Sequence, residues 1–204
     1  DLVLPFGIHQ YGFLYRKNIM VVFGSKDAGK TAFLLNVARL NMKKHHTVYW
    51  SSEMVDDEFR QRLANYDGME IEDWSSLEAY ERSYDFDEVI VPNALNLVDY
   101  LEMGGDTTEY YKAVSLIRKI YDRLDQGIAV IALQKNPNAA YPKGGWGALE
   151  KARLAVSLDS NRITLTVCKN WVTGNTVNPK GKSWTYQLVK GVNIVNQRES
   201  VVEF

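Results

Sequence analysis

Apolar runs of four to nine residues recur along the chain, and the segments between them have helical periodicity. The clearest runs cover residues 18–23, 47–50, 95–103 and 128–133, and most are rich in β-branched and aromatic side chains. Runs of this kind are typical of buried strands. Between the first two, Phe33, Val37 and Leu40 recur at helical spacing. This alternation predicts an α/β fold with a mainly parallel, twisted sheet flanked by helices.

Further helices and strands are expected around this framework. Helices are predicted over residues 31–40, 55–66, 74–84 and 114–124. Residues 153–158 and 162–168 look like two strands around a turn at Asp159–Asn161, and 184–189 with 192–195 look like a terminal antiparallel hairpin. Residues 1–18 are expected to form an N-terminal segment without chemistry of its own that packs on a domain over residues 19–204.

Residues 24–31 fit the pattern G-x-x-x-x-G-K-[ST], the phosphate-binding loop of P-loop NTPases. The loop comprises Gly24, Ser25, Lys26, Asp27, Ala28, Gly29, Lys30 and Thr31. Glycines let the backbone N–H groups point into one concavity, and the following helix adds its positive end. Lys30 can reach the β- and γ-phosphates, and the Thr31 hydroxyl can hold Mg²⁺. The alternative is a chance match in a surface turn, but a strand before and a helix after the loop favour the phosphate site.

Three polar side chains follow or end other predicted strands. Glu53 follows the strand at 47–50, Asp99 lies within 95–103, and Gln134 follows 128–133. A carboxylate beside a phosphate loop can deprotonate an attacking water, so Glu53 is a candidate base. The alternative makes Glu53 a first-turn residue of the next helix. Asp99 is suited to holding the water shell of Mg²⁺ as a Walker B acid, although aspartates at strand ends are common.

The composition of the chain excludes some classes of protein but does not indicate a function. The 204 residues carry 24 basic and 25 acidic side chains, for a formal net charge of −1, which gives no bulk sign of nucleic-acid binding. The single cysteine, Cys168, fits a reducing compartment such as the cytoplasm. No apolar stretch approaches a membrane span, and the start does not resemble a signal peptide. Since the chain begins at Asp1 rather than Met, we expect an excised domain or a processed product.

Taken together, these motifs resemble the RecA-like ATPase core, and most closely the C-terminal motor domain of DnaB-type replicative helicases. That family typically has Ser-Leu-Glu-Met after its second strand and Asp-Tyr-Leu-Gln at Walker B. This chain has Ser51-Ser52-Glu53-Met54 and Asp99-Tyr100-Leu101-Glu102, and a late strand that ends in Lys169-Asn170. The resemblance spans roughly residues 18–195. It implies an ATPase that uses ATP and Mg²⁺, acts on single-stranded DNA, and assembles as a homo-oligomeric ring such as a hexamer.

The resemblance also implies roles for individual residues. Glu53 would be the catalytic glutamate, and Gln134 would sense the γ-phosphate and couple it to a DNA-facing loop. Residues 135–147 would form the second DNA-binding loop, with 104–108 near the first. Contacts to DNA are expected from Lys135, Tyr141, Lys143 and Trp146. Lys169 would reach the nucleotide of the neighbouring subunit.

One position departs from the family pattern. The family commonly ends its late strand with Lys-x-Arg, but here Trp171 stands where the arginine would be. An arginine finger can contribute ~10³–10⁵ in rate in other NTPases, so its absence weakens the case for activation between subunits. Alternatively, Trp171 simply packs at a strand end. The leading hypothesis is a helicase or translocase, and the alternative is a regulatory or recombination-type ATPase without unwinding activity. A nucleotide-binding interaction module with little turnover is disfavoured by the combination of Glu53, Asp99 and Gln134.

Overall fold

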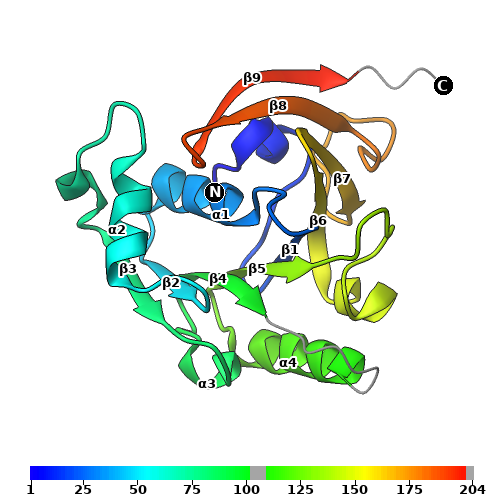
Figure 1. Ribbon diagram of the computed structural model, residues 1–204. Helices are drawn as coiled ribbons and strands as arrows, with labels where there is room; N and C mark the ends of the chain where they lie inside the picture. Colours follow the sequence, from blue (N-terminus) through cyan, green and yellow to red (C-terminus); the bar gives the residue numbers. More distant parts are fainter. Residues whose placement is uncertain (102–108, 201–204) are drawn as a thin grey trace.

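Nine strands of the described residues form one sheet with helices on both faces (Figure 1). The computed structural model describes residues 1–101 and 109–200. The strands are β1 (Ile19–Gly24), β2 (Thr47–Ser51), β3 (Leu77–Glu81), β4 (Leu95–Leu101), β5 (Ile128–Gln134), β6 (Ala152–Asp159), β7 (Arg162–Cys168), β8 (Ser183–Val189) and β9 (Asn193–Ser200). Their order across the sheet is β3-β2-β4-β5-β1-β6-β7-β8-β9. The pairs from β3 to β6 are parallel, and those from β6 to β9 are antiparallel. The predicted α/β fold with a mostly parallel sheet and C-terminal antiparallel strands is confirmed.

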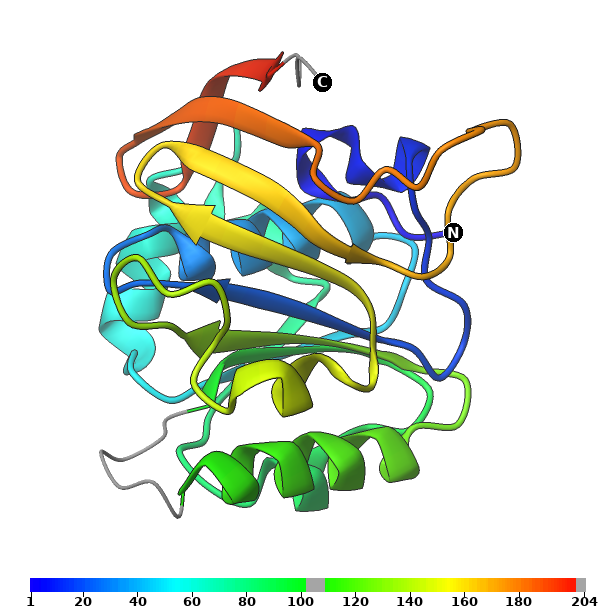
Figure 2. The ribbon, with the colours of Figure 1, turned by 90° about the vertical axis from the view of Figure 1, so that its right-hand side faces the viewer.

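Helices cover the two faces of this sheet (Figure 2). The α-helices are α1 (Lys30–Asn41), α2 (Asp56–Ala64), α3 (Phe86–Val89) and α4 (Glu109–Arg123), and the 3₁₀-helices are η1 (Pro5–Gln10), η2 (Ile71–Trp74) and η3 (Gly145–Leu149). Side chains of β1 alternate between two cores: Val22 packs with α1 and α2, whereas Val21 packs with α3 and α4. A central parallel strand buried on both faces therefore reads as a continuous apolar run. No helix among the described residues has the length and apolarity needed to span a bilayer.

The helix predicted over residues 74–84 is wrong. This part of the chain forms η2 and then β3, which pairs in parallel with β2 from Leu77 opposite Thr47. β3 is an edge strand, and most of its side chains are exposed. An edge strand has a neighbouring strand on one side only and tolerates charged side chains. Because β3 is acidic and not apolar, its sequence does not show the pattern of a buried strand. The ring of Tyr80 stacks on Trp50 of β2, with centroids 5.1 Å apart.

The N-terminal segment packs between α1 and β8 (Figure 1). Phe6 is buried, and its ring lies 6.5 Å from that of Phe33 in α1 and 5.1 Å from that of Tyr186 in β8. Gly12 forms an isolated antiparallel bridge with Trp171. The Trp171 side chain is 42% exposed, so it does not fill the core. Residues 1–18 therefore tie the C-terminal strands to the first helix.

Candidate functional site

The carboxyl ends of four neighbouring parallel strands bring together residues that lie far apart in the sequence. Gly24 at the end of β1 is in register with Gln134 at the end of β5. Ser51 at the end of β2 is in register with Asp99 of β4. Because β2, β4, β5 and β1 are consecutive in the sheet, these ends form one edge. Ligands of open α/β sheets bind outside the carboxyl ends of the strands, so this edge is the candidate site.

The loop between β1 and α1 has a left-handed backbone at two positions. Asp27 and Gly29 have positive φ angles of 59° and 92°, and alternating backbone handedness of this kind turns N–H groups into an anion-binding concavity. Gly29 is the N-cap of α1 and has no side chain to cap the first turn. The first-turn N–H groups have no acceptor within the helix. The Lys30 ammonium curls back over the loop, donating to the Ser25 carbonyl oxygen at 2.8 Å.

Close packing holds this loop from two sides. A Cβ on Gly24 would lie 2.8 Å from the Leu158 carbonyl oxygen of β6, so only glycine fits at this strand end. From the C-terminal hairpin, the buried Tyr186 hydroxyl donates to the Ala28 carbonyl oxygen at 3.1 Å. Leu188 of the same strand reaches the cavity beside the loop. β8 is therefore a support for the phosphate loop, which the local sequence pattern did not indicate.

Asp99 lies almost fully buried beside the loop, with 4% of its surface exposed. The Tyr49 hydroxyl donates to its Oδ2 at 2.5 Å. Burial raises the pKa of Asp99, while hydrogen bonds from the Tyr49 and Thr31 hydroxyls and the positive charges of Lys30 and Arg62 act in the opposite direction. The net direction is upward, so these hydrogen bonds and positive charges offset only part of the effect of burial on the pKa of Asp99.

Glu53 lies on the connection between β2 and α2 and lines the cavity. Two contacts hold this connection: the Ser52 N–H donates to the Asp99 carbonyl oxygen at 2.8 Å, and the Met54 N–H donates to Ser51 Oγ at 3.0 Å. The Met54 side chain is buried. α2 begins at Asp56, and Glu53 is not among the acidic residues of its first turn. The helix-start alternative for Glu53 is therefore wrong, whereas its predicted catalytic role stays a prediction.

The cavity at this edge has a volume of about 410 Å³. Its lining residues come from the phosphate loop, α1, the β2–α2 connection, α2, the ends of β4 and β5, and the terminal hairpin: Lys26, Asp27, Gly29, Lys30, Thr31, Ala32, Glu53, Arg62, Asp99, Gln134, Leu188 and Gly191. The volume is within the usual range for small-molecule sites, ~300–1,000 Å³. Burial lowers the pKa of Lys30, and the negative charges of Asp99, Glu53 and Asp27 act against that shift. Cations and carboxylates thus face one another across the cavity, as a site for a phosphate–metal complex requires.

Gln134 connects this cavity to the long loop that follows β5. Its side chain lines the cavity, and its Oε1 accepts a hydrogen bond from Lys143 Nζ at 3.3 Å. Its carbonyl oxygen accepts from the Lys143 N–H at 2.7 Å. Tyr141 and Trp146 are 49% and 55% exposed, and their rings lie edge to face with centroids 6.0 Å apart. Both aromatic residues therefore lie at the surface, and Lys143 links their loop to the cavity.

Lys135, which begins the same loop, is buried and does not lie at the surface with Tyr141 and Trp146. It is 4% exposed, and its ammonium lies 2.6 Å from Asp159 Oδ1 and 3.1 Å from Ser157 Oγ, both near the end of β6. The expectation that Lys135 contacts DNA does not fit this structure, because its ammonium is buried and already pairs with a carboxylate of the same chain. The other DNA loop expected from the sequence, residues 104–108, lies outside the described residues.

Lys169 lies at the opposite edge of the sheet from the cavity. β7 runs antiparallel to β6, so its first residue, Arg162, pairs with Asp159 near the phosphate loop, and its end lies at the far edge. There the Lys169 ammonium donates to the Glu150 carbonyl oxygen at 2.7 Å. Burial is the main cause that lowers the pKa of Lys169. Within one chain Lys169 therefore has no part in the site, and any action on a nucleotide requires a second copy.

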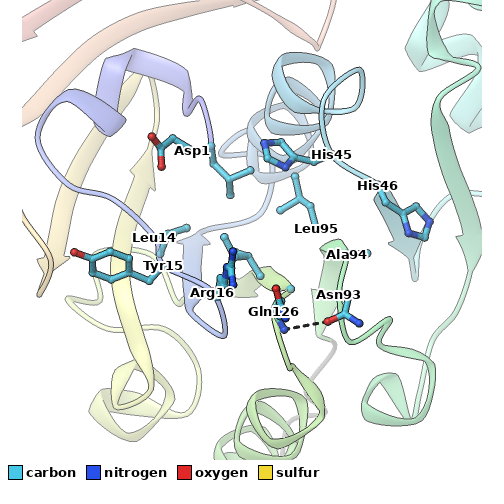
Figure 3. Close-up of a pocket in the computed structure, with 13 residues that line it drawn as sticks. Asp1, Leu14, Tyr15, Arg16, His45, His46, Asn93, Ala94, Leu95 and Gln126 are labelled. Atoms are coloured by element: carbon cyan, nitrogen blue, oxygen red, sulfur yellow. Dashed lines mark hydrogen bonds between the residues drawn. The ribbon is translucent and has the colours of Figure 1, made fainter.

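A second cavity, of about 460 Å³, lies at this opposite edge (Figure 3). It lies among segments that precede the strands, with His45 and His46 on one side and Tyr15 on the other. Asn93 Oδ1 accepts the Gln126 N–H across its floor at 3.1 Å. Over residues 1–101 and 109–200, no group of three or more His, Cys, Asp or Glu side chains is placed to hold a metal ion, at either cavity.

Comparison of the chain with protein-family models gave no match, and curated proteins gave none either. The residues of the site must therefore be judged on their geometry. The sequence patterns did not identify Arg62 as a site residue. Its position could have indicated this role, because it is a basic residue beside the apolar face of the helix that follows Glu53. Tyr49 carried no such signal, since a tyrosine in an apolar strand usually indicates only β-propensity.

Proposed function

We propose that this chain is an ATP-binding and ATP-hydrolysing domain of the RecA-like P-loop class, acting as a DnaB-like motor on single-stranded DNA. The observation that carries the proposal is the convergence at one sheet edge of the phosphate loop, Asp99, Gln134 and Glu53 around a single cavity. These residues come from four separate stretches of the sequence. A chance match to the loop motif gives no reason for the other three to meet it.

The loop and its surroundings fit a nucleoside triphosphate with Mg²⁺. The uncapped first turn of α1 offers N–H donors to phosphate oxygens, and Lys30 can exchange its contact with the Ser25 carbonyl oxygen for a phosphate. Protein-bound Mg²⁺ commonly uses one or two carboxylates plus substrate phosphates. Thr31 and Asp99 would therefore hold the ion, which neutralises charge on the phosphates when bound. This donor set suits a nucleotide-borne ion better than a free one.

Glu53 and Gln134 are placed for the chemical step. Glu53 is held at the cavity by the backbone of the β2–α2 connection, where it can accept a proton from an attacking water. Gln134 lines the same cavity, where its amide can contact a terminal phosphate. Arg62 contributes a further positive charge from the same chain. Because positioned positive charge stabilises phosphoryl transfer, Arg62 is a candidate to supply part of what the missing arginine near Trp171 would provide.

Action on DNA is supported by the loop after β5. Tyr141 and Trp146 offer exposed rings for stacking of bases, worth ~1–3 kcal/mol per base in other proteins. Lys143 joins this loop to Gln134, so nucleotide at the cavity and DNA at the loop would act on the same contact. The runner-up is a regulatory or recombination-type ATPase. The inward position of Lys135 and the tryptophan at position 171 favour that alternative.

Two measurements test the proposal. Lys30→Ala should abolish binding of a fluorescent ATP analogue without unfolding the chain, whereas Lys44→Ala, which removes an exposed lysine away from the cavity, should bind normally. Equal affinity in Lys30→Ala and the parent would refute the nucleotide site. The rate of ATP hydrolysis is then measured with and without single-stranded DNA. Stimulation by DNA that is lost in Glu53→Gln supports the motor, and hydrolysis indifferent to DNA supports the regulatory alternative.

A further inference from the structure

Tyr49 places a hydroxyl in a part of the core where a phenylalanine would pack equally well. Its side chain is fully buried in the middle of β2, and its ring lies 5.2 Å from that of Phe59 in α2. A buried hydroxyl destabilises the fold unless it is hydrogen-bonded. Here the hydroxyl donates to the Asp99 carboxylate, with 2.5 Å between the Tyr49 hydroxyl oxygen and Asp99 Oδ2. Short O–H···O⁻ bonds of this kind are about twice as strong as neutral ones.

The register of the sheet explains how the two side chains meet. Tyr49 is paired with Leu97, and Ser51 with Asp99. Side chains two residues apart on a strand share a face, so Tyr49 and Asp99 both lie on the face covered by α1 and α2. The Tyr49 hydroxyl of β2 therefore reaches the Asp99 carboxylate of the neighbouring strand β4 on the same face of the sheet. The Thr31 hydroxyl, at the end of the phosphate loop, also hydrogen-bonds this carboxylate, and both residues line the cavity.

A carboxylate on a short side chain turns freely about its terminal bond unless neighbours hold it, because that torsion is broad. The Thr31 hydroxyl can donate to Asp99 while its oxygen faces a metal ion, but it has a single O–H, so it supplies one hydrogen bond to the carboxylate and Tyr49 supplies another. Mg²⁺ requires near-ideal octahedral geometry, so a turned carboxylate would weaken the ion's site. The phosphate contacts of Lys30 and the α1 N–H groups would not change, since they do not involve Asp99.

From these contacts we infer that Tyr49 is a positioning residue for the metal site: its hydroxyl fixes the rotation of the Asp99 carboxylate that holds the nucleotide-bound Mg²⁺. The inference rests on the proposed function. Partners that orient metal ligands typically contribute 10–100-fold in metal affinity. Tyr49 should therefore affect the metal and leave the affinity for nucleotide alone unchanged.

The test is Tyr49→Phe, with Tyr66→Phe as the matched control. Tyr66 is also buried on this face, and its hydroxyl accepts a hydrogen bond from Asn36 Nδ2 at 3.1 Å. That amide keeps two carbonyl acceptors when the hydroxyl is removed, on Ala32 and Val192. Binding of a fluorescent ADP analogue is measured in EDTA, and Mn²⁺ affinity of the ADP complex is measured by electron paramagnetic resonance. We expect Tyr49→Phe to weaken Mn²⁺ binding by about tenfold with nucleotide affinity in EDTA unchanged, and Tyr66→Phe to change neither.

The coupling between the two side chains is measured in a second background. In Asp99→Asn the carboxylate is already lost, so adding Tyr49→Phe should not weaken Mn²⁺ binding further. Unchanged Mn²⁺ affinity in Tyr49→Phe, or an equal loss in both backgrounds, would overturn the positioning role while the nucleotide site stands. If the parent chain bound no nucleotide in EDTA or with Mn²⁺, the proposed function itself would fail, and this inference with it.

Discussion

The ion pair between Lys135 and Asp159 allows a sharp test of the structure, because its two members differ in exposure. The Lys135 side chain is 4% exposed, whereas that of Asp159 is 49% exposed, and their charged atoms are 2.6 Å apart. Asp159→Ala leaves a buried ammonium that keeps its hydrogen bond to Ser157 Oγ but loses its carboxylate partner. Lys135→Met removes the internal charge and leaves a carboxylate that water can solvate.

The difference in exposure between Lys135 and Asp159 predicts unequal losses of stability in the two variants. Removing one partner of a buried pair costs about 3–5 kcal/mol, and we expect about 3 kcal/mol for Asp159→Ala because water partly reaches its place. Breaking an exposed pair costs about 0–1 kcal/mol, which is the expectation for Lys135→Met. At roughly 2–4 °C per kcal/mol for a chain of this size, the melting temperature should fall by about 6–12 °C for Asp159→Ala. For Lys135→Met the same conversion gives at most about 4 °C.

Thermal denaturation followed by circular dichroism at neutral pH measures both changes. The double variant is the control: once the ammonium is gone, Asp159→Ala should cost little, so the double variant should melt close to Lys135→Met. The burial of Lys135 would be refuted if Asp159→Ala lowered the melting temperature no more than Lys135→Met did. A solvent-facing Lys135, as expected of a DNA-binding loop, would give that result.

Three further predictions concern other parts of the chain. Gly127→Ala should destabilise the fold by about 1–3 kcal/mol, because the added Cβ would lie 2.5 Å from the backbone oxygen of Ala94. In the control Gly147→Ala the nearest atom is a side-chain methyl at 3.0 Å, so urea titration should show a smaller loss of stability. Burial raises the pKa of Cys168 to about 11, so this thiol should react with Ellman's reagent slowly at pH 8 and rapidly in urea, and rapid reaction of the folded chain would contradict its burial. Lys169→Ala should leave nucleotide affinity of the single chain unchanged, because Lys169 lies at the opposite edge of the sheet; tenfold weaker binding by calorimetry would place it in the chain's own site.

Local features of the sequence determined much of this architecture. The apolar runs that became β1, β2 and β5 could be recognised because buried parallel strands need apolar side chains on both faces. The turn between β1 and α1 could be predicted because its shape depends on consecutive residues, with Gly29 supplying a positive φ and α1 following directly. In these stretches neighbours along the chain decide the conformation, so the sequence alone is sufficient.

Tertiary structure decided what depends on strand order and register. Tyr49 and Asp99 are 50 positions apart, and only the parallel pairing of β2 with β4 brings the phenol to the carboxylate. Lys135 points inward because β6 pairs with β1 and delivers Asp159 beside it. The same sequence pattern, a lysine opening a long polar loop, would otherwise indicate a solvent-facing charge. Contacts between distant segments follow from which strands pair and in what register, and the pattern of apolar residues along one strand does not encode its neighbour.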